Sequence, residues 1–213
     1  MALGFLMVGG RSRRIRRTKA DLAWYPGGSS GEEPPTSLAR HLCGVLASVC
    51  TSTYLLGDRA VDGVEVPRLS DATPHSGPLG GLLSALEMPG PTLRIILSCD
   101  TPFVDAVLLR QLLQAAETAA VLPDVVVARD AEGCLHPLCA VYHQRLGRPL
   151  RSFLHAHARE RLLQDAPDAV PGKAPSLQQF LDTASVETLE VTESRLLRNL
   201  NTMQEYLAAL RGR

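Results

Sequence analysis

Two short, mostly apolar runs most limit what this chain can fold into. Residues 2–8 (ALGFLMV) stop at Gly9-Gly10, and residues 92–98 (TLRIILS) stop at Cys99-Asp100. Mostly apolar runs this short are typical of strands buried on both faces of a parallel sheet. Segments with helical apolar spacing lie between them. This alternation predicts a parallel sheet covered by helices on both faces.

The rest of the chain extends the alternation and adds one hairpin. Apolar spacing predicts helices over 37–50 (with Ser37 as cap), 79–88, 104–119, 144–157, 176–184 and after Thr202, where Thr202 and Glu205 have capping-box spacing. Short strands are expected over 52–57, 63–67, 125–129, 135–142 and 185–191. Asp130–Gly133 is typical of a hairpin connection, which makes the sheet mixed. Residues 25–35, rich in Pro, Gly, Ser and Glu, are expected to be a surface loop. We therefore predict a three-layer α/β/α, Rossmann-like fold with a mixed, mostly parallel sheet, in one domain over 1–213.

The charge balance and the cysteines narrow the class of protein. The 213 residues include 22 basic and 22 acidic side chains, so no overall basic field favours a nucleic-acid or membrane partner. The five cysteines are odd in number and contain no C-x-x-C pair, which favours reduced thiols in a cytoplasmic protein. No apolar run approaches the length of a membrane span, and the apolar N-terminus is interpreted as a strand, not a signal peptide.

A glycine-containing basic loop follows the first apolar run. It spans Met7 to Lys19 and reads MVGGRSRRIRRTK. Glycines after a strand let backbone N–H groups approach an anion closely, and Arg and Lys side chains add charge-assisted bonds to phosphate oxygens. The spacing is neither the dinucleotide fingerprint nor the P-loop pattern, so a tight turn with a solvated basic face is an equal alternative.

Four further segments could carry chemistry. Asp100, at the end of a buried strand, could hold Mg²⁺ or could cap the next helix. The Ser76–Gly81 segment (SGPLGG) could recognise a base through bare backbone or could be an ordinary turn. Asn199 and Asn201, on alternate residues, could face one ligand or serve in a turn. His136 could contact a substrate, although a lone histidine is more often structural.

The order of these segments resembles the molybdenum cofactor guanylyltransferases, members of the larger sugar-nucleotide pyrophosphorylase-like nucleotidyltransferase superfamily. Their N-terminal pattern L-A-G-G-x-S-x-R-M-G-x-D-K aligns without a gap to MVGGRSRRIRRTK. Their G-P-L-x-G, C-D-x-P and N-x-N-T segments correspond to Gly77–Gly81, Cys99–Pro102 and Asn199–Thr202. The resemblance covers about residues 4–208 and is weakest between Trp24 and Val66.

The resemblance implies a function and a set of site residues. The reaction would transfer GMP from GTP to the phosphate of molybdopterin, the molybdenum cofactor, and release pyrophosphate. Residues 1–103 would be the nucleotide-binding half and 104–213 the cofactor-substrate half. Transient contacts with proteins that deliver the cofactor or with molybdoenzymes are also implied. The catalytic residues would be Lys19, Asp100 (holding Mg²⁺) and Arg14; the nucleotide-binding residues would be Met7, Val8, Gly9, Gly10, Lys19, Asp71, Gly77, Pro78 and Asp100; the cofactor-substrate side would be lined by Asn199, Asn201 and His136.

One part of the loop departs from the family pattern. Where the family has M-G-x-D, this chain has Ile15-Arg16-Arg17-Thr18, which removes a flexible glycine and a partner for Lys19. Two alternatives therefore stay open. One is a cytidylyl- or sugar-1-phosphate nucleotidyltransferase on the same fold, and the other is a non-catalytic nucleotide-binding homologue.

Overall fold

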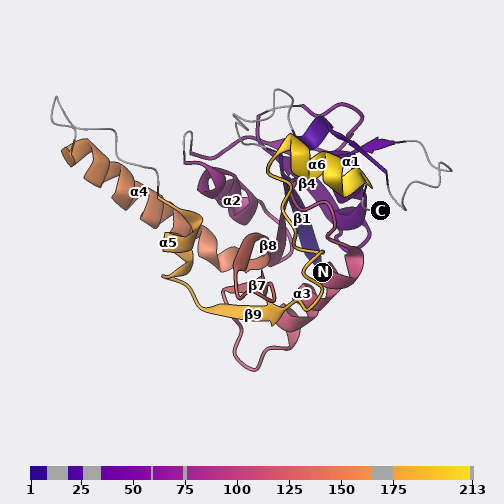
Figure 1. Ribbon diagram of the computed structural model, residues 1–213. Coiled ribbons are helices and arrows are strands. Elements are labelled where there is room, and N and C mark those ends of the chain that lie inside the picture. The colour runs from indigo at the N-terminus through magenta and orange to yellow at the C-terminus, as the bar shows by residue number, and fades with distance from the viewer. Residues whose placement is uncertain (9–18, 26–34, 59, 74–75, 165–174, 212–213) are drawn as a thin grey trace.

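The fold is known from a computed structural model that describes residues 1–8, 19–25, 35–58, 60–73, 76–164 and 175–211. A seven-stranded sheet has the strand order β5-β4-β1-β6-β8-β7-β9 (Figure 1). Its strands are β1 (Ala2–Met7), β4 (Ser52–Leu56), β5 (Arg68–Leu69), β6 (Leu93–Ser98), β7 (Val125–Arg129), β8 (Leu135–His143) and β9 (Val186–Glu190). Only β8 runs antiparallel to its neighbours β6 and β7; the other pairings are parallel. The predicted mixed, mostly parallel sheet is confirmed.

Helices cover both faces of this sheet. On one face, α1 (Leu38–Ala47) and α3 (Ala106–Thr118) pack on a core that includes Leu6, Ile95 and Val126. On the other face, α2 (Pro78–Glu87), α4 (Gly147–Gln164) and α5 (Leu177–Leu181) pack on a core that includes Phe5 and Ile96. Neighbouring strand residues such as Phe5 and Leu6 enter opposite cores because side chains alternate along a strand. The three-layer prediction is confirmed.

The predicted helix starts have the expected caps. Ser37 Oγ accepts the Arg40 N–H at 3.2 Å at the start of α1. At the start of α6 (Met203–Arg211), Thr202 and Glu205 exchange bonds of 3.1 and 2.9 Å. Such caps satisfy backbone N–H groups that have no partner inside the helix. Asp100 does not cap α3, because Asp105 does so through a 2.8 Å bond to the Leu108 N–H.

Two local predictions need correction, and one small sheet was not predicted. Residues 63–67 are not a strand, because Gly63 has φ +70° in a turn closed by a Val64 N–H bond to Val61 O. The strand begins after Pro67, as β5. Helix α4 is longer than the expected 144–157. A 3-10 turn, Gln144–Leu146, precedes α4. A two-stranded antiparallel sheet, β2 (Ala23–Trp24) with β3 (Thr36–Ser37), was not predicted, since two residues carry no readable alternation.

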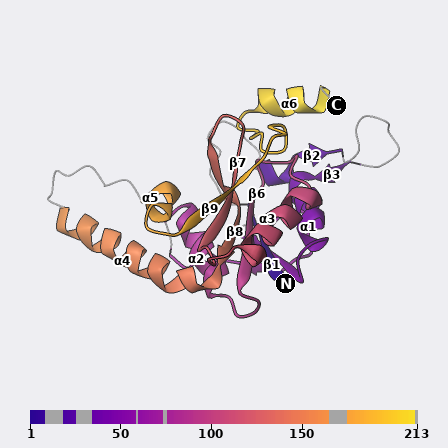
Figure 2. The ribbon, with the colours of Figure 1, turned by 90° about the horizontal axis from the view of Figure 1, so that it is seen from below.

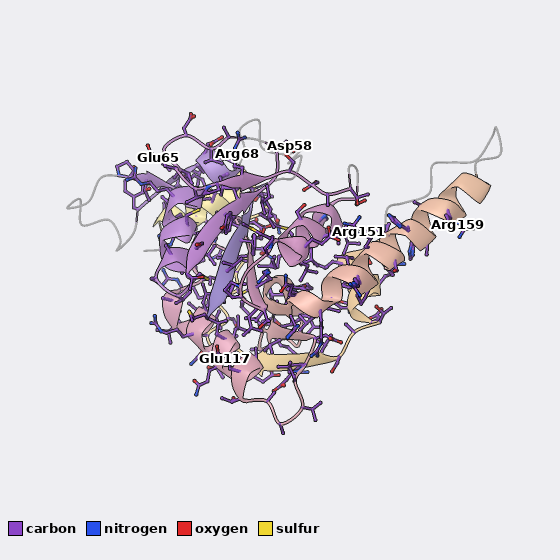
Figure 3. The ribbon with its side chains drawn as sticks, turned by 180° about the vertical axis from the view of Figure 1, so that it is seen from behind. Asp58, Glu65, Arg68, Glu117, Arg151 and Arg159 are labelled. Carbon is purple, nitrogen blue, oxygen red and sulfur yellow. The ribbon has the colours of Figure 1, made fainter. Side chains whose placement is uncertain are left out.

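Helix α4 packs on the sheet at its N-terminal end, and its C-terminal end projects away from the rest of the protein (Figure 1). Figure 3 shows Arg151 on the part near the body and Arg159 farther out. The guanidinium of Arg151 pairs with the carboxylate of Glu87 at the end of α2, with one N–O distance of 2.7 Å. This pair lies at the surface, so packing of Leu150 and Leu154 in the core holds α4 more strongly than the ion pair does.

A buried arginine caps the carboxyl end of α2 by donating hydrogen bonds to its last carbonyl groups. Arg94, on β6, is fully buried and donates to Ala85 O at 2.9 Å and to Met88 O at 2.5 Å. Gln144 also donates to Met88 O, at 3.1 Å. The last carbonyls of a helix have no partner within it, so these donors replace water there. The arginine therefore fixes the helix whose other end lies at the pocket described below.

A third, smaller core lies at the end of the sheet. It contains Leu22, Trp24, Leu38, Leu200, Tyr206 and Ala209, which come from β2 and the residue before it, α1, α6 and the segment before α6. Figure 2 shows α6 beyond the end of the sheet farthest from the N-terminus. This small core thus attaches the C-terminal helix to the edge where β1 ends.

The described part of the chain contains neither a disulfide bond nor a helix that could cross a membrane. The five cysteines are all free, as expected, and Cys99 is a buried thiol whose pKa is raised to about 12 by that burial. Within the ranges given above, no helix is long and apolar enough to cross a membrane.

Candidate active site

The site residues gather at the carboxyl edge of the parallel strands. β1 and β6 lie in register from Ala2–Leu93 to Met7–Ser98, so both strands end at the same level. Beyond that level the Cys99 N–H still donates to Met7 O at 3.2 Å. In open α/β sheets, ligands bind at this edge. The carboxyl ends of the two strands therefore lie side by side.

Lys19, Asp100 and Asn201 meet at this edge. Lys19 Nζ donates to Asn201 Oδ1 at 3.1 Å and lies 3.7 Å from Asp100 Oδ2. The Lys19 side chain is 15% exposed and that of Asp100 is 27% exposed. A cation, a carboxylate and an amide oxygen from three distant segments thus share one partly covered position. Such a group can contact a polyphosphate and a hard cation together.

The asparagine segment, Asn199–Thr202, is anchored by the buried residue Leu200. Leu200 is buried in the small third core, and its N–H donates to Asp100 O at 2.7 Å. Asn199 and Asn201, on either side of Leu200, are exposed. The expected alternation is therefore present, with the apolar residue turned inward and both asparagines on the solvent side. The structure brings Asn201 to Lys19.

A pocket of about 200 Å³ lies next to the end of β1. Its walls are formed by Met7, Leu56, Asp71, Gly77, Pro78, Gly81, Ser98 and Leu138. Four of these, Met7, Asp71, Gly77 and Pro78, are residues that the resemblance implied for nucleotide binding. Burial, followed by the negative charge of Asp58, raises the pKa of the Asp71 carboxyl. Val8 is not among the pocket residues, because its side chain is buried in the core.

The glycines of the 77–81 segment have separate roles. Gly77 precedes α2 with φ +58°, a conformation that L side chains rarely adopt. A Cβ at Gly80 would lie 2.7 Å from Thr73 O, and one at Gly81 would lie 3.3 Å from Asp71 Oδ1. The bare backbone therefore lets the Asp71 segment pack directly on α2. These glycines have a structural role in addition to any contact with a base.

His136 belongs to a different pair. Its Nε2 lies 2.8 Å from Asp130 Oδ2, and both side chains are 14% exposed. Asp130 Oδ1 also accepts the Cys134 N–H at 2.8 Å, and the hydrogen bond from His136 holds the pKa of Asp130 below its usual range. No hydrogen bond or ion pair joins His136 to Lys19, Asp100 or Asn201, all of which the structure describes. The pair lies where the β7–β8 hairpin extends past the end of β6.

Three predicted residues, Gly9, Gly10 and Arg14, lie outside the described residues, as does the departing Ile15–Thr18 segment.

Asp100 provides the donor chemistry that a magnesium ion requires. Mg²⁺ is commonly held by one or two carboxylates together with substrate phosphates, not by a complete protein cage. Asp100 supplies a partly exposed carboxylate at the strand end, with Lys19 next to it for the phosphates. Within the described ranges, no group of three or more His, Cys, Asp or Glu side chains comes together. The residues fit a metal that is shared with a nucleotide.

Sequence reasoning missed three supporting contacts. Trp24 and Phe103 pack edge to face with ring centroids 5.3 Å apart, and the guanidinium carbon of Arg195 lies 5.0 Å from the centroid of the Phe103 ring. Glu205 accepts the Asn201 N–H at 2.6 Å, in addition to its capping bonds. The capping-box spacing pointed to Glu205, but no pattern in the sequence linked Trp24 to Phe103.

Comparison with known proteins agrees with this geometry. A family model described as the MobA-like NTP transferase domain matches residues 4–170. The chain belongs to this family. It is a nucleotidyltransferase, and two relatives are each named a probable molybdenum cofactor guanylyltransferase. The protein from Mycobacterium tuberculosis strain H37Rv is 32% identical over 174 residues, or 78% of this chain and 81% of that protein. The protein from Chloroflexus aggregans is 31% identical over 209 residues, or 95% and 90%.

A solved structure shares the fold of this nucleotidyltransferase. It is the molybdopterin-guanine dinucleotide biosynthesis protein A from Archaeoglobus fulgidus, with a TM-score of 0.72 and 17% identity. The match covers 99% of this chain and 97% of the other. The predicted fold class is thereby confirmed.

Proposed function

We propose that this nucleotidyltransferase transfers GMP from GTP to the phosphate of molybdopterin, forming the guanine dinucleotide cofactor and releasing pyrophosphate. The observation that carries the proposal is the meeting of Lys19, Asp100 and Asn201 beside the pocket at the end of β1. The names of the relatives support guanine as the base and the molybdenum cofactor as the acceptor.

The chemistry needs no nucleophile from the protein. An oxygen of the acceptor phosphate forms a bond to the α-phosphorus of GTP, while the bond from that phosphorus to the bridging oxygen breaks and pyrophosphate departs. Cys99, the thiol nearest in sequence to Asp100, has a pKa raised to about 12 by burial, so it stays protonated at neutral pH. The protein therefore acts by positioning the two substrates and by neutralising charge.

Each residue has a distinct part in this scheme. Lys19 would offset charge on the departing pyrophosphate, together with Arg14 of the basic loop. Asp100 would hold Mg²⁺, which when bound supplies Lewis-acid polarisation of phosphate oxygens. Together such contacts provide on the order of several kcal/mol of transition-state stabilisation.

The two substrates would lie on either side of Lys19. Met7, Asp71, Gly77 and Pro78 would contact GTP in the pocket that they line. Asn199, Asn201 and His136 would contact the cofactor on the other side. Lys19 donates to Asn201 Oδ1, which supports a place for Lys19 next to the cofactor side.

A panel of nucleotides tests the proposal. Thermal unfolding is measured with GTP, CTP, ATP and UTP in the presence of Mg²⁺, because a ligand at about 100 times its Kd adds about 2.7 kcal/mol to apparent stability. GTP is expected to raise Tm most. Pyrophosphate release is then followed with GTP and the molybdenum cofactor.

Each other outcome excludes the proposal in a different way. A larger shift with CTP or UTP would indicate a cytidylyl- or sugar-1-phosphate nucleotidyltransferase. Binding of GTP without pyrophosphate release in the presence of the cofactor would indicate a non-catalytic homologue.

A further inference from the structure

Two adjacent residues of α6 hold the two segments that meet at the site. Glu205 contacts the asparagine segment, and Tyr206 contacts the segment that follows Lys19. Nothing in the proposed chemistry uses either side chain directly. Both lie on the first turns of a helix that sits across the end of the sheet (Figure 2).

Glu205 does more than cap its helix. Its Oε2 accepts the Thr202 N–H at 2.9 Å, as a capping box requires, and it also accepts the Asn201 N–H at 2.6 Å. These two hydrogen bonds hold the pKa of the Glu205 carboxyl below its usual range. A carboxylate that binds two successive N–H groups fixes the peptide planes on both sides of the Asn201 Cα. The direction of the Asn201 side chain is therefore set from α6.

Tyr206 holds the other side of the same contact. Its hydroxyl donates to Ala23 O, and its ring is buried with Leu22 and Trp24. Leu22 in turn donates its N–H to Lys19 O at 3.1 Å, so the short segment from Lys19 to Trp24 is tied to α6. Lys19 Nζ and Asn201 Oδ1, 3.1 Å apart, are thus each supported by one of two neighbouring residues of one helix.

The segment that contains Asp100 and Phe103 also contacts the residues that α6 holds in place. Leu200 donates its N–H to Asp100 O at 2.7 Å, and Trp24 packs edge to face on Phe103. A displacement of α6 would therefore change the relation of Lys19, Asp100 and Asn201 to one another without touching the nucleotide pocket. Misplacement of reacting groups by about 1 Å can cost roughly a hundredfold in rate.

We propose that Glu205 and Tyr206 are positioning residues: Glu205 aligns Asn201 for the acceptor substrate, and Tyr206 aligns Lys19 for the departing pyrophosphate. This role rests on the proposed function. Glu205 acts through Asn201, and Tyr206 acts through the Lys19 segment. Loss of the Glu205 contact affects use of the acceptor and leaves nucleotide affinity in place.

The kinetic test compares Glu205→Ala, Glu205→Gln and a matched control. We expect Glu205→Ala to lower kcat/KM for the cofactor at least tenfold and to change the Kd for GTP less than twofold. Glu205→Gln keeps an oxygen that can accept both N–H groups, so it is expected to retain activity within about threefold of wild type. Gln179→Ala removes the equivalent capping contact of α5, where Gln179 Oε1 accepts the Ser176 N–H at 2.8 Å, and is expected to leave the cofactor kinetics unchanged. Equal kinetic losses in Glu205→Ala and Gln179→Ala would overturn the proposal.

A double-mutant cycle tests whether Glu205 acts through Asn201. In an Asn201→Ala background, Glu205→Ala is expected to add less than a twofold further loss, because the side chain that it orients is gone. Fully additive losses would refute a positioning role.

Amide hydrogen exchange of the full chain separates this proposal from the proposed function. Glu205→Ala is expected to speed exchange in residues 199–202, and Tyr206→Phe in residues 19–24, while Gln179→Ala changes neither. Unchanged exchange in the first two variants would refute the positioning role even if the wild type is active. If these variants exchange faster but the wild-type protein releases no pyrophosphate, the proposed function would be refuted. The conclusion that α6 holds these segments in place would remain.

Discussion

Lys19 Nζ lies 3.7 Å from Asp100 Oδ2, although the two residues belong to segments that follow different strands. Both side chains are mostly covered, at 15% and 27% exposed. A cation and a carboxylate held this close at a strand end form a position that can contact a metal-bound triphosphate, the cation through phosphate oxygens and the carboxylate through the metal. The first two predictions concern these two residues.

Replacing Lys19 removes one cation from the phosphate region. We expect Lys19→Ala to lower the rate of GMP transfer at least tenfold, about 1.4 kcal/mol on the barrier. Pyrophosphate release under saturating GTP and cofactor measures this rate. Arg110→Ala, which removes an exposed cation on α3, is the control and should retain the wild-type rate. A wild-type rate in Lys19→Ala would assign the phosphate contacts to the arginines of the loop.

Replacing Asp100 removes the carboxylate proposed to hold Mg²⁺. Asp100→Ala should abolish turnover, with a loss of at least about a hundredfold, or about 2.7 kcal/mol. Its Tm should stay close to that of the wild type, because α3 is capped by Asp105 and not by Asp100. Asp182→Ala, at the end of α5, is a control outside the site. Unchanged transfer of GMP in Mg²⁺ would show that the metal ligand lies elsewhere.

Replacing His136 tests the acceptor side of the site. His136→Ala is expected to raise KM for the cofactor about tenfold while the Kd for GTP stays the same, since His136 is joined to Asp130 and not to the Lys19 group. Steady-state kinetics with varied cofactor, together with GTP titration, separates the two effects. His155→Ala, on an exposed part of α4, should change neither value. Loss of GTP affinity in His136→Ala would move this residue to the nucleotide side.

The strands and helix caps of this fold can be predicted because they depend on local sequence. Residues 2–8 are apolar throughout, residues 92–98 are mostly apolar, and Ser37 precedes an apolar period, so their states were correctly predicted. The edge strand Arg68–Leu69 was misplaced because two residues at a sheet edge have no alternation to detect. Pairing with β4 determines this strand instead.

The site was predicted only in part, for a related physical reason. The resemblance named Lys19, Asp100 and Asn201. No local sequence pattern predicts that the Lys19 ammonium group contacts the amide oxygen of Asn201, which lies near the other end of the chain. That contact depends on Leu200 and Tyr206 entering the small third core. Contacts between distant segments follow from packing, which periodicity does not encode.

Arg94 stabilises the fold through the end of α2. Arg94→Met keeps much of the length of the side chain but leaves Ala85 O and Met88 O without the buried donor. We expect a loss of about 2–3 kcal/mol in the free energy of unfolding, or roughly 4–12 °C in Tm. Arg68→Met is the control. Arg68 donates to Asp58 O at 2.9 Å at the surface, so its loss should cost about 0.5 kcal/mol or less. Equal Tm shifts in the two variants would contradict the capping role of Arg94.

Asp124 should make the stability of the fold depend on pH. Burial alone would raise the pKa of its carboxyl, but hydrogen bonds from the Ser185 N–H at 2.9 Å and from Arg145 Nε at 2.7 Å outweigh burial and lower it. A carboxyl with a lowered pKa stabilises the folded state fully above its unfolded pKa of about 3.9, and this contribution is lost as the pH falls through the lower folded value. Asp124→Asn should therefore cost about 1–3 kcal/mol at pH 7, and less at pH 3 and below. Urea unfolding of both proteins at the two pH values measures the difference, with Asp182→Asn as the control. A cost for Asp124→Asn that is as large at acid pH as at pH 7 would show that the Asp124 charge does not stabilise the fold.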